Sequence, residues 1–600
     1  MFNPLNYIQF FSKSEIVQNI IYSVLVPLGL VDFTLQTFLV IFLFQQRLSL
    51  ARGHLSRIPC NGTVLLTFFL FRALILLVAS KYCELDILGL KSLTNQIPPL
   101  FFQLIFYSNF FVVTIISILS FTSCLLGLIN LRGQGSFETS VSRTEAGTSN
   151  IPIVAIVMPI YNEDTEVFLE AVQSAVSCNY VEEKTHLFIS FDEAEETELY
   201  LLAMKHLLLQ QTATVKGALN NLCDSSGQIY PTRVDCVINK IRVTISRFPH
   251  SGKHATQART FTIINDLYGK FADNVFVLFV DSDIILEKGT IFNFVTASLN
   301  DPNLKAVTGL ITCADSTREY CKCENTREDN KCKNMGEGKK FQNCSRRGKP
   351  NCYQHLQDCE YIQGQMFSRA MEGILGAVTC LPGALSFIKL NALQEVAPKY
   401  FKNKEHLNRS QDFHRYFLGE DRYLTWLLMR GAGKHQISFA CIAQCSTEAP
   451  DSFRKLLQQR RRWFLGGISN DIAMLECASM WWKYPGVMIL KFHNYSFRGT
   501  DWLYWIFLLN LMVVRQGETE MAGKEFFHDG YLYAVFTLTG LHLAGLFAIA
   551  VLLNKPRIIF SSILIHFLCP IFNLIVTIYS LWTWKRRTWG GPRTDKLSIV

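Results

Sequence analysis

The sequence predicts an integral membrane protein in which one α/β domain lies between two groups of membrane helices. Hydrophobic residues make up 49% of the 600 positions and charged residues only 18%, a balance typical of a chain partly embedded in lipid. Long apolar runs gather at both ends, whereas short runs of β-branched residues alternate with helical patterns in the middle. That alternation predicts a parallel sheet with ligands bound where its strands end.

The N-terminal region, residues 1–131, contains three apolar runs, each long enough or nearly so for the ~20 residues that cross a bilayer. Arg72 lies inside the second run, and we expect it to face a neighbouring helix or water. The basic link between the first two runs is expected to be cytosolic, which also makes the chain after Leu131 cytosolic. Residues 1–19 lack the features of a cleavable signal peptide. The three runs are Ile20–Phe44, Val64–Ser80 and Leu100–Leu131.

An α/β domain is expected over residues 151–463, after a Gly-, Ser- and Thr-rich linker at residues 132–150. Its clearest strands lead to acidic side chains, which parallel strands bring to one edge of a sheet. An Asp-x-Asp pair there can hold a divalent cation that neutralises a diphosphate, although most such triplets are solvated turns. The strands and the acids after them are Ile153–Met158 with Glu163, His186–Phe191 with Asp192, and Val275–Val280 with Asp281 and Asp283.

Further motifs carry side chains suited to phosphate and sugar. His250–Lys253 offers a glycine for close backbone approach and a lysine charge for phosphate, although an ordinary basic turn has the same composition. Gly419–Arg422 offers carboxylates that could serve as a general base. Gln459–Trp463 combines arginine forks that match phosphate oxygens with a Trp face on which a sugar ring can lie. Taken alone, this basic run is equally typical of a contact with lipid head groups.

Seven of the eighteen cysteines fall within an insert at residues 313–359. In an oxidising compartment they would predict a disulfide framework, but the expected cytosolic location keeps thiols reduced. Zinc is an alternative, although no clean pair of C-x-x-C knuckles is present, and a loop with free thiols is the simplest interpretation. The seven are Cys313, Cys321, Cys323, Cys332, Cys344, Cys352 and Cys359.

Interfacial helices are expected over residues 464–499, and a second membrane region with a basic tail over residues 500–600. The first apolar run of this region is too short to cross a bilayer alone. The acidic loop after it and the basic tail agree with one topology only if one of the three runs lies in the interface or re-enters the membrane. The runs are Trp502–Val514, Tyr531–Leu553 and Ile558–Trp582.

The order of these motifs resembles that of the processive family 2 glycosyltransferases, and their spelling is similar to the chitin synthases. The resemblance covers roughly residues 151–593 and implies a cytosolic GT-A (Rossmann-like) glycosyltransferase domain inserted between N- and C-terminal transmembrane helices. The chain departs from the family in its short length, its cysteine-rich insert and the Gly591-Pro592 pair. These departures bear on the identity of the polymer more than on the type of reaction. The matching segments are Cys380-Leu381-Pro382-Gly383, Gly419–Thr425, Thr447–Phe453, Gln459–Trp463, Ser580–Trp582 and Trp589–Arg593.

The resemblance implies a role for each residue that matches a motif. Asp421 would be the catalytic base, which takes the proton of the acceptor 4-hydroxyl, and Asp283 would coordinate Mg²⁺ or Mn²⁺. Arg460 and Arg461 are left as lipid or structural contacts. The expected donor-binding residues are Glu163, Asp192, Lys253, Asp281, Gln459 and Arg462. The expected acceptor-binding residues are Leu381, Pro382, Gly383, Glu420 and Trp463.

The implied function is inverting, processive transfer of N-acetylglucosamine from UDP-N-acetylglucosamine (UDP-GlcNAc) to β-1,4-linked chitin, with translocation across the plasma membrane. Expected partners are the donor, the growing glycan, membrane lipid and further copies of the chain in a homo-oligomer, and the net charge of +9 does not require nucleic acid. A hyaluronan synthase or another β-glycan synthase of the family is the alternative.

Two other classes are disfavoured by the residues. A transporter with a nucleotide-sensing domain would need more charged positions in the apolar runs than Asp32 and Arg72. A catalytically inactive relative would not need the full set of acidic and basic site residues that this chain retains.

Overall fold

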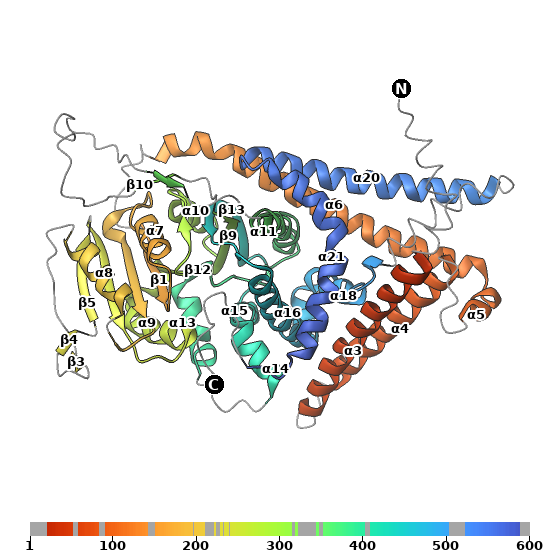
Figure 1. Cartoon of the computed structure of the whole chain (residues 1–600), viewed down its shortest axis with the longest axis horizontal. Coiled ribbons are helices and arrows are strands. Elements are labelled where there is room, and N and C mark those ends of the chain that lie inside the picture. The colour runs from red at the N-terminus through yellow and green to blue at the C-terminus, as the bar shows by residue number, and fades with distance from the viewer. Residues whose placement is uncertain are drawn as a thin grey trace.

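The structure is a computed structural model, and an α/β domain occupies one end of it while long helices extend from that domain (Figure 1). The described residues are 21–51, 58–82, 90–141, 151–195, 197–209, 221–223, 229–231, 233–238, 240–314, 319–321, 344–346, 352–402, 409–502 and 522–587.

A nine-stranded mixed sheet forms the centre of the α/β domain, in the order β5-β6-β2-β1-β7-β12-β9-β13-β8. Strands β6, β2, β1 and β7 are parallel to one another, as expected. β1 continues through Pro159 to Ile160, two residues past the predicted end. The pairing of β1 with β7 already ends at Val157, so at Pro159 only β2 is a hydrogen-bonded neighbour. The missing N–H of the proline therefore costs no hydrogen bond to β7.

The prediction of a parallel sheet is wrong for β12, which runs antiparallel to both β7 and β9. β12 starts at the edge where β7 ends, with Leu385 opposite Val280. We call the edge where β1, β2 and β7 end the carboxyl edge. The antiparallel strand matters for the site, because it brings the Cys380–Gly383 segment to the carboxyl edge.

Besides the nine-stranded main sheet, the described residues form two short hairpins. The main sheet contains β1 Ile153–Ile160, β2 Thr185–Phe191, β5 Arg233–Ile238, β6 Ile241–Arg247, β7 Val275–Val280, β8 Ile285–Leu286, β9 Ala306–Cys313, β12 Leu385–Lys389 and β13 Ile437–Thr447. The hairpins pair β3 Asn221–Cys223 with β4 Ile229–Pro231 and β10 Glu319–Cys321 with β11 Cys344–Arg346.

Helices cover both faces of the sheet, and buried side chains fill the layer on each face. In β1, for example, Val154, Ile156 and Met158 belong to one core cluster and Ala155 and Val157 to the other, as the twofold period of a strand requires. The helices of this part are α7 Thr165–Val176, α8 Glu198–Leu209, α9 Lys253–Tyr268, α10 Thr290–Asn300, α11 Cys352–Gln363, α12 Ala370–Ile374, α13 Leu390–Tyr400, α14 Ser410–Phe413, α15 Glu420–Gly431, α16 Phe453–Leu475, α17 Ala478–Lys483 and α18 Pro485–Ser496. Short π-helical turns are η1 Ile21–Leu25, η5 Gly364–Arg369 and η6 His414–Leu418, and 3₁₀ turns are η3 Glu182–Lys184 and η4 Gly269–Asn274.

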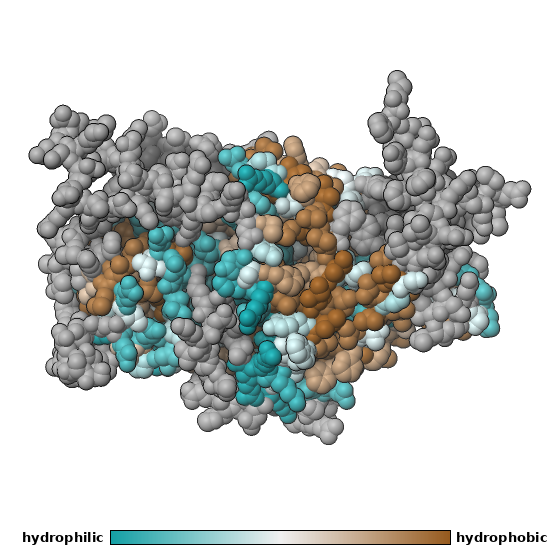
Figure 2. All heavy atoms as spheres, viewed as in Figure 1, coloured by the Kyte–Doolittle hydropathy of each residue, from teal (hydrophilic) through white to brown (hydrophobic). Residues whose placement is uncertain are grey.

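The three N-terminal spans expected from the apolar runs are present as helices long and apolar enough to cross a bilayer, over Ser23–Arg47, Gly62–Lys81 and Phe111–Ile129. A fourth candidate is a pair of segments bent by 62°, Arg557–Ile565 and Leu568–Trp582. On the face in Figure 2, hydrophobic residues gather over α21 and the α3–α4 pair. The apolar-end helices are α3 Val26–Ala51, α4 Ile58–Tyr82, α5 Leu90–Gln96, α6 Pro99–Val141, α20 Ala522–Leu552 and α21 Arg557–Trp582.

Two helices pass through boundaries that composition had suggested. α6 continues to Val141, into the stretch expected as a linker, and α16 passes through position 463, where the α/β domain was expected to end. Most of the run Trp502–Val514 lies outside the described residues.

Arg72 faces neighbouring helices, as expected, and its side chain is buried. Its Nη1 donates hydrogen bonds to the carbonyls of Ser496 at 3.0 Å and Arg498 at 2.6 Å, and its Nη2 donates to the Phe33 carbonyl. Nε donates to the Thr37 hydroxyl at 2.8 Å. Arg72 therefore fastens α3 and α4 to the end of α18.

Candidate active site

Glu163 and the Asp281–Asp283 turn follow the neighbouring strands β1 and β7 and meet at the carboxyl edge. The Ser282 hydroxyl donates a hydrogen bond to Glu163 Oε2 at 2.6 Å, and the Asp164 backbone N–H donates to Glu163 Oε1 at 2.9 Å. Glu163 is buried, and both of its oxygens accept from protein donors. In the structure Glu163 therefore holds the Asp281–Asp283 turn in place.

Asp192 is buried at the end of β2 and organises the loop before α9. Its carboxylate accepts hydrogen bonds from the backbone N–H groups of Ser251 at 3.0 Å and Gly252 at 2.9 Å, and from the Thr256 hydroxyl at 2.9 Å. Gly252 has φ +86°, a left-handed conformation that favours glycine. This loop places Lys253 at the first position of α9. The expected donor-binding role of Asp192 stays a prediction.

Lys253 lies between two carboxylates that come from distant parts of the sequence. Its Nζ is 2.5 Å from Asp281 Oδ1 and 3.6 Å from Glu420 Oε1. Burial by itself would lower the pKa of Lys253, but Asp281 and Glu420 raise it above the ordinary value and keep the ammonium charged. A Cβ atom on Gly383 would lie 3.0 Å from Nζ, so the glycine leaves room for this charge.

Asp283 has the donor chemistry of a partial metal site. Burial and then the charge of Asp281 raise the pKa of Asp283 to about 6, although the Thr447 hydroxyl donates a hydrogen bond to its Oδ2 at 3.0 Å. Crowded carboxylate and hydroxyl oxygens suit Mg²⁺ or Mn²⁺. No group of three or more His, Cys, Asp or Glu side chains among the described residues could hold a metal ion. A cation held here would need further ligands from a bound molecule or water.

Asp421 is at the start of α15, where the helix dipole favours negative charge. Its Oδ1 accepts the Arg422 backbone N–H at 2.8 Å, and its Oδ2 accepts the Cys380 thiol at 3.4 Å. Each carboxylate oxygen thus has one donor from the protein. These contacts fix the orientation of the carboxyl plane.

A small cavity lies beside Asp421 and Glu420, with a volume of about 10 Å³, which is room for about one water molecule. Burial and then Asp421 raise the pKa of Glu420, while Lys253 and Arg462 act in the opposite direction. The other lining residues are Gln257, Phe279, Leu381, Gly383, Ser386, Tyr400 and Leu424.

The Leu-Pro-Gly segment reaches the site mainly through its backbone and its glycine. Leu381 is buried in the core, and its N–H donates to the Thr425 hydroxyl at 2.8 Å. The Pro382 carbonyl accepts the Ser386 hydroxyl at 2.5 Å. Gly383 faces Lys253. The acceptor roles expected for these three residues stay predictions.

A close helix crossing that we did not predict holds Asp421 relative to α16. A Cβ atom on Gly466 would lie 2.7 Å from the Gly419 nitrogen, and one on Gly419 would lie 2.7 Å from the Gly466 oxygen. Asn470 Nδ2 donates to both glycine carbonyls at 3.0 Å and to the Arg415 carbonyl at 3.1 Å. The glycine pair at 466–467 inside a helical pattern was the available signal.

The arginines of the Gln459–Trp463 run face three different neighbours. Arg461 donates to the Thr583 hydroxyl and carbonyl and to the Arg586 carbonyl, next to the end of α21. Arg460 pairs with Glu360 of α11 at 2.7 Å, and its guanidinium lies 4.2 Å from the Trp463 ring centroid. Both are structural contacts, one of the two interpretations left open.

The other members of the run lie nearer the expected donor and acceptor. The charge of Arg462 acts to lower the pKa values of both Lys253 and Glu420. Gln459 Oε1 is buried and has no hydrogen-bond partner within the described part of the chain. The Trp463 ring is 5.8 Å from the Tyr361 ring. Tyr361, from the end of the insert, was not predicted to lie here.

A buried charge network behind the site was also missed. Lys491 of α18 lies 3.1 Å from Glu372 Oε1 and 3.5 Å from Asp471 Oδ2, and Arg422 lies 3.4 Å from Asp471 Oδ1. The Tyr495 hydroxyl donates to Asp471 at 2.9 Å. Two carboxylates and two cations balance, and they join α12, α15, α16 and α18 behind Asp421.

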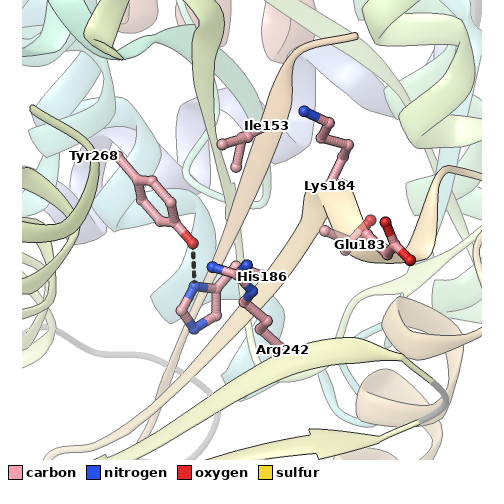
Figure 3. Close-up of a pocket in the computed structure, with 7 residues that line it drawn as sticks. Ile153, Glu183, Lys184, His186, Arg242 and Tyr268 are labelled. Carbon is pink, nitrogen blue, oxygen red and sulfur yellow. Dashed lines mark hydrogen bonds between the residues drawn. The ribbon is translucent and has the colours of Figure 1, made fainter. Parts of the chain in front are cut away.

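A larger cavity of about 220 Å³ lies away from these residues, at the opposite edge of the sheet, where β1 and β2 begin (Figure 3). His186 forms two hydrogen bonds, from Nδ1 to the Tyr268 hydroxyl at 2.7 Å and from Nε2 to the Thr244 hydroxyl at 2.8 Å, and one ring nitrogen donates while the other accepts. Burial and then Arg242 lower the pKa of His186 to about 3, so the imidazole is neutral. None of the predicted site residues lines this cavity.

Two predicted features lie largely outside the described residues. They include Trp589–Arg593 and, in the insert, Cys323 and Cys332. Of the described insert cysteines, Cys313 and Cys359 are buried free thiols. Asp358, between them in α11, binds Lys555 Nζ at 2.6 Å and so joins the insert to the turn between α20 and α21.

Comparison with known families first defines the class. Residues 152–466, more than half of the chain, match the family model described as glycosyltransferase like family 2, and the chain belongs to that family. This agrees with a mixed central sheet that carries acidic motifs at its carboxyl edge. The GT-A fold class predicted from the motif order is confirmed.

A second similarity concerns the C-terminal half, where residues 348–597 match the family model described as chitin synthase. Similar curated proteins are chitin synthase 6 of Gibberella zeae, with 35% identity over 74% of this chain and 51% of the relative, and chitin synthase D of Aspergillus fumigatus, with 32% over 82% and 60%. Chitin synthase VI of Metarhizium acridum is 34% identical over 74% of this chain and 62% of its own length. The predicted resemblance to the chitin synthases is confirmed, and the chain spans about half to three fifths of these relatives.

Among solved structures, the mannosyltransferase from Pyrobaculum calidifontis in complex with GDP-Man and Mn²⁺ is similar at 11% identity and a TM-score of 0.35. The match covers 75% of this chain and 99% of the other. Similarity at that level carries no argument about the site.

Proposed function

We propose that this chain transfers N-acetylglucosamine from UDP-GlcNAc to the end of a growing glycan and makes β-1,4-linked chitin. The observation that carries the proposal is the position of Lys253, whose ammonium lies between Asp281 and Glu420. Glu420 precedes Asp421 and lines the same small cavity, so it connects a cation suited to a leaving diphosphate with a carboxylate suited to a base. The match of residues 348–597 to the chitin synthase family model and the similarity to curated chitin synthases support the choice of sugar.

The donor diphosphate binds on the Lys253 side of the site in this proposal. Lys253 and Arg462 supply positive charge, Asp281 contacts the donor, and Asp283 would hold Mg²⁺ or Mn²⁺, whose charge would neutralise the diphosphate. Gln459, whose buried Oε1 has no partner within the described residues, accepts a hydrogen bond from the UDP-sugar through that oxygen. Glu163 and Asp192 contribute by holding the Asp281–Asp283 turn and the Lys253 loop.

Asp421 acts as the base in the transfer step. The acceptor 4-hydroxyl loses its proton to the Asp421 carboxylate as its oxygen bonds to C1 of the donor sugar, and the C1–O bond to UDP breaks. Attack opposite the leaving group converts the α-linked donor into a β-linked product. The cavity beside Asp421 has room for one hydroxyl, and Trp463 stacks on an acceptor sugar.

Processive synthesis and translocation are supported by the connections between the site and the membrane helices. Arg461 joins α16 to the end of α21, and Asp358 joins α11 to Lys555 between α20 and α21. A glycan that leaves Trp463 therefore passes to helices fixed relative to the site. We place the protein in the plasma membrane with the α/β domain in the cytosol, in contact with lipid and with other copies of the chain.

The proposal is tested with the purified full-length chain in lipid nanodiscs. UDP release is measured with UDP-GlcNAc alone, with Mg²⁺ or Mn²⁺, and the polymer is digested separately with chitinase and hyaluronidase. We expect release that requires the metal and a product that only chitinase degrades. A requirement for UDP-glucuronic acid and a product sensitive to hyaluronidase would instead identify a hyaluronan synthase. Absence of UDP release from any UDP-sugar contradicts a transferase activity of the isolated chain.

A further inference from the structure

The Cys380 side chain touches the carboxylate of the proposed base. Its thiol donates to Asp421 Oδ2 at 3.4 Å, a normal distance for a sulfur donor, and the side chain is buried. We infer that Cys380 is a positioning residue, which orients the Asp421 carboxylate for proton removal. This inference rests on the proposed function, in which Asp421 is the base.

Two observations fit a thiol that acts as a donor at this place. Burial and then Asp421 raise the pKa of Cys380 to about 12, so the sulfur keeps its hydrogen at neutral pH. The other carboxylate oxygen accepts the Arg422 N–H at 2.8 Å. A thiol is a weaker hydrogen-bond donor than a hydroxyl. It can therefore orient the Asp421 carboxylate and still leave the carboxylate a stronger base than a hydroxyl donor would.

The segment that carries Cys380 is held on both sides, so the thiol cannot swing away easily. The preceding Thr379 donates from its N–H and hydroxyl to Glu372 at 2.9 and 2.8 Å. The following Leu381 N–H donates to the Thr425 hydroxyl, which itself donates to the Asp421 carbonyl at 2.7 Å. The Cys380 segment and the Asp421 turn are therefore linked at two points.

Several charged or titratable groups act on Asp421 from the elements packed around it. Glu420 and Arg422 belong to its own helix, Cys380 comes from the loop before β12, and Tyr400 comes from α13. Glu420 is in turn paired with Lys253 of α9. Of these, Cys380 donates a hydrogen bond to the Asp421 carboxylate from its side chain, and it can be exchanged for the near-isosteric serine without changing the net charge, which makes it the informative position.

The test compares Cys380→Ala and Cys380→Ser with wild type in UDP release from UDP-GlcNAc, measured as kcat and KM across pH. Loss of a hydrogen bond to a charged group predicts that Cys380→Ala lowers kcat about tenfold or more, with little change in KM. We expect the acid limb of its kcat/KM profile to move to higher pH. In Cys380→Ser the hydroxyl restores the donor, so activity is regained and the acid limb moves back to or below the wild-type position.

Cys236→Ala serves as the matched control, because Cys236 is a buried thiol in β5, remote from Asp421. It should leave kcat and the pH profile unchanged. A Cys380→Ala enzyme with a wild-type kcat and pH profile overturns the inference, and so does a folded Cys380→Ser enzyme no better than Cys380→Ala. Asp421→Asn distinguishes failure of the proposed function from failure of the Cys380 inference. Substantial activity in that variant contradicts the assignment of the base, whatever the Cys380 variants do.

Discussion

Arg461 in α16 binds Thr583, the residue that follows the end of α21. Its Nε donates to the Thr583 hydroxyl at 2.6 Å, and its Nη2 donates to the Thr583 carbonyl at 2.8 Å and to the Arg586 carbonyl at 2.9 Å. Exposed carbonyls at a helix C-terminus attract a cation, and a planar guanidinium can reach several at once. The helix that carries Arg462 and Trp463 is thereby fixed directly to a candidate membrane helix.

Replacing the two neighbouring arginines should have opposite kinetic signatures. Arg461→Lys keeps the charge but loses the fork, so we expect lower thermal stability, by about 1–3 kcal/mol, and an unchanged KM for UDP-GlcNAc. Arg462→Lys should instead raise KM for the donor, because lysine keeps the charge but loses the fork that binds two phosphate oxygens at once. Melting curves and UDP-release kinetics on both variants provide the measurement. An increase in donor KM in Arg461→Lys alone would show that the roles are reversed.

The crossing of Gly419 and Gly466 should not tolerate a methyl group. In Gly466→Ala the new Cβ would lie 2.7 Å from a backbone nitrogen, so the two helices must separate and Asp421 must move relative to α16. We expect a loss of roughly 1–3 kcal/mol in stability from overpacking and a large fall in kcat. Gly364→Ala is the control, because a Cβ there meets no atom within 4 Å. Equal behaviour of the two variants would argue against a tight crossing.

Asp283 should set the metal requirement. Chelation with EDTA is expected to abolish UDP release, and added Mg²⁺ or Mn²⁺ to restore it. Asp283→Asn removes a charged ligand, so half-maximal activation should need at least about tenfold more metal. Thr447→Val, which removes only the hydrogen bond to Asp283, should have a smaller effect. Unchanged metal titrations in Asp283→Asn would place the cation elsewhere.

Breaking the buried charge network should strongly lower the free energy of unfolding, and a second substitution should recover part of that loss. Lys491→Met leaves Glu372 and Asp471 without their shared cation, which typically costs about 3–5 kcal/mol. Adding Glu372→Gln should recover part of this loss, because one uncompensated charge is removed. Lys455→Met, which breaks the more exposed pair with Asp451, should cost no more than about 1 kcal/mol. Chemical denaturation of the four proteins measures the differences.

His186 predicts acid sensitivity of the α/β domain. Its pKa is about 3 in the folded state and near 6.5 in the unfolded state, so the unfolded chain binds the extra proton between these values. Stability from this group is therefore complete above pH 6.5 and falls as the pH drops toward 3, by about 2–3 kcal/mol between pH 7 and pH 4.5. His186→Gln, which does not titrate, should lose less stability over the same interval. Melting curves of wild type and His186→Gln at the two pH values provide the measurement. An equal loss of stability in both proteins would contradict the role of His186.

Much of the site could be predicted because its parts are local in the sequence. Asp192 and the Asp281–Asp283 turn follow strands that an apolar run reveals, and the topology of parallel strands brings such ends together. The contact of Cys380 with Asp421 could not be predicted, because it depends on β12 running antiparallel to β7. The same is true of Gly466 against Gly419, since the approach of two helices has no local pattern beyond small residues.

The sequence by itself determined the kind of protein, because motif order and apolar periodicity are properties of the chain that survive any folding detail. It predicted the α/β domain, the three N-terminal candidate spans and the residues that could carry charge to a nucleotide sugar. Only the tertiary structure decided how the arginine run divides its contacts. Arg461 turns to Thr583, Arg460 to Glu360, and Arg462 to the Lys253 side, because successive residues on a helix point in directions about 100° apart and meet different neighbours.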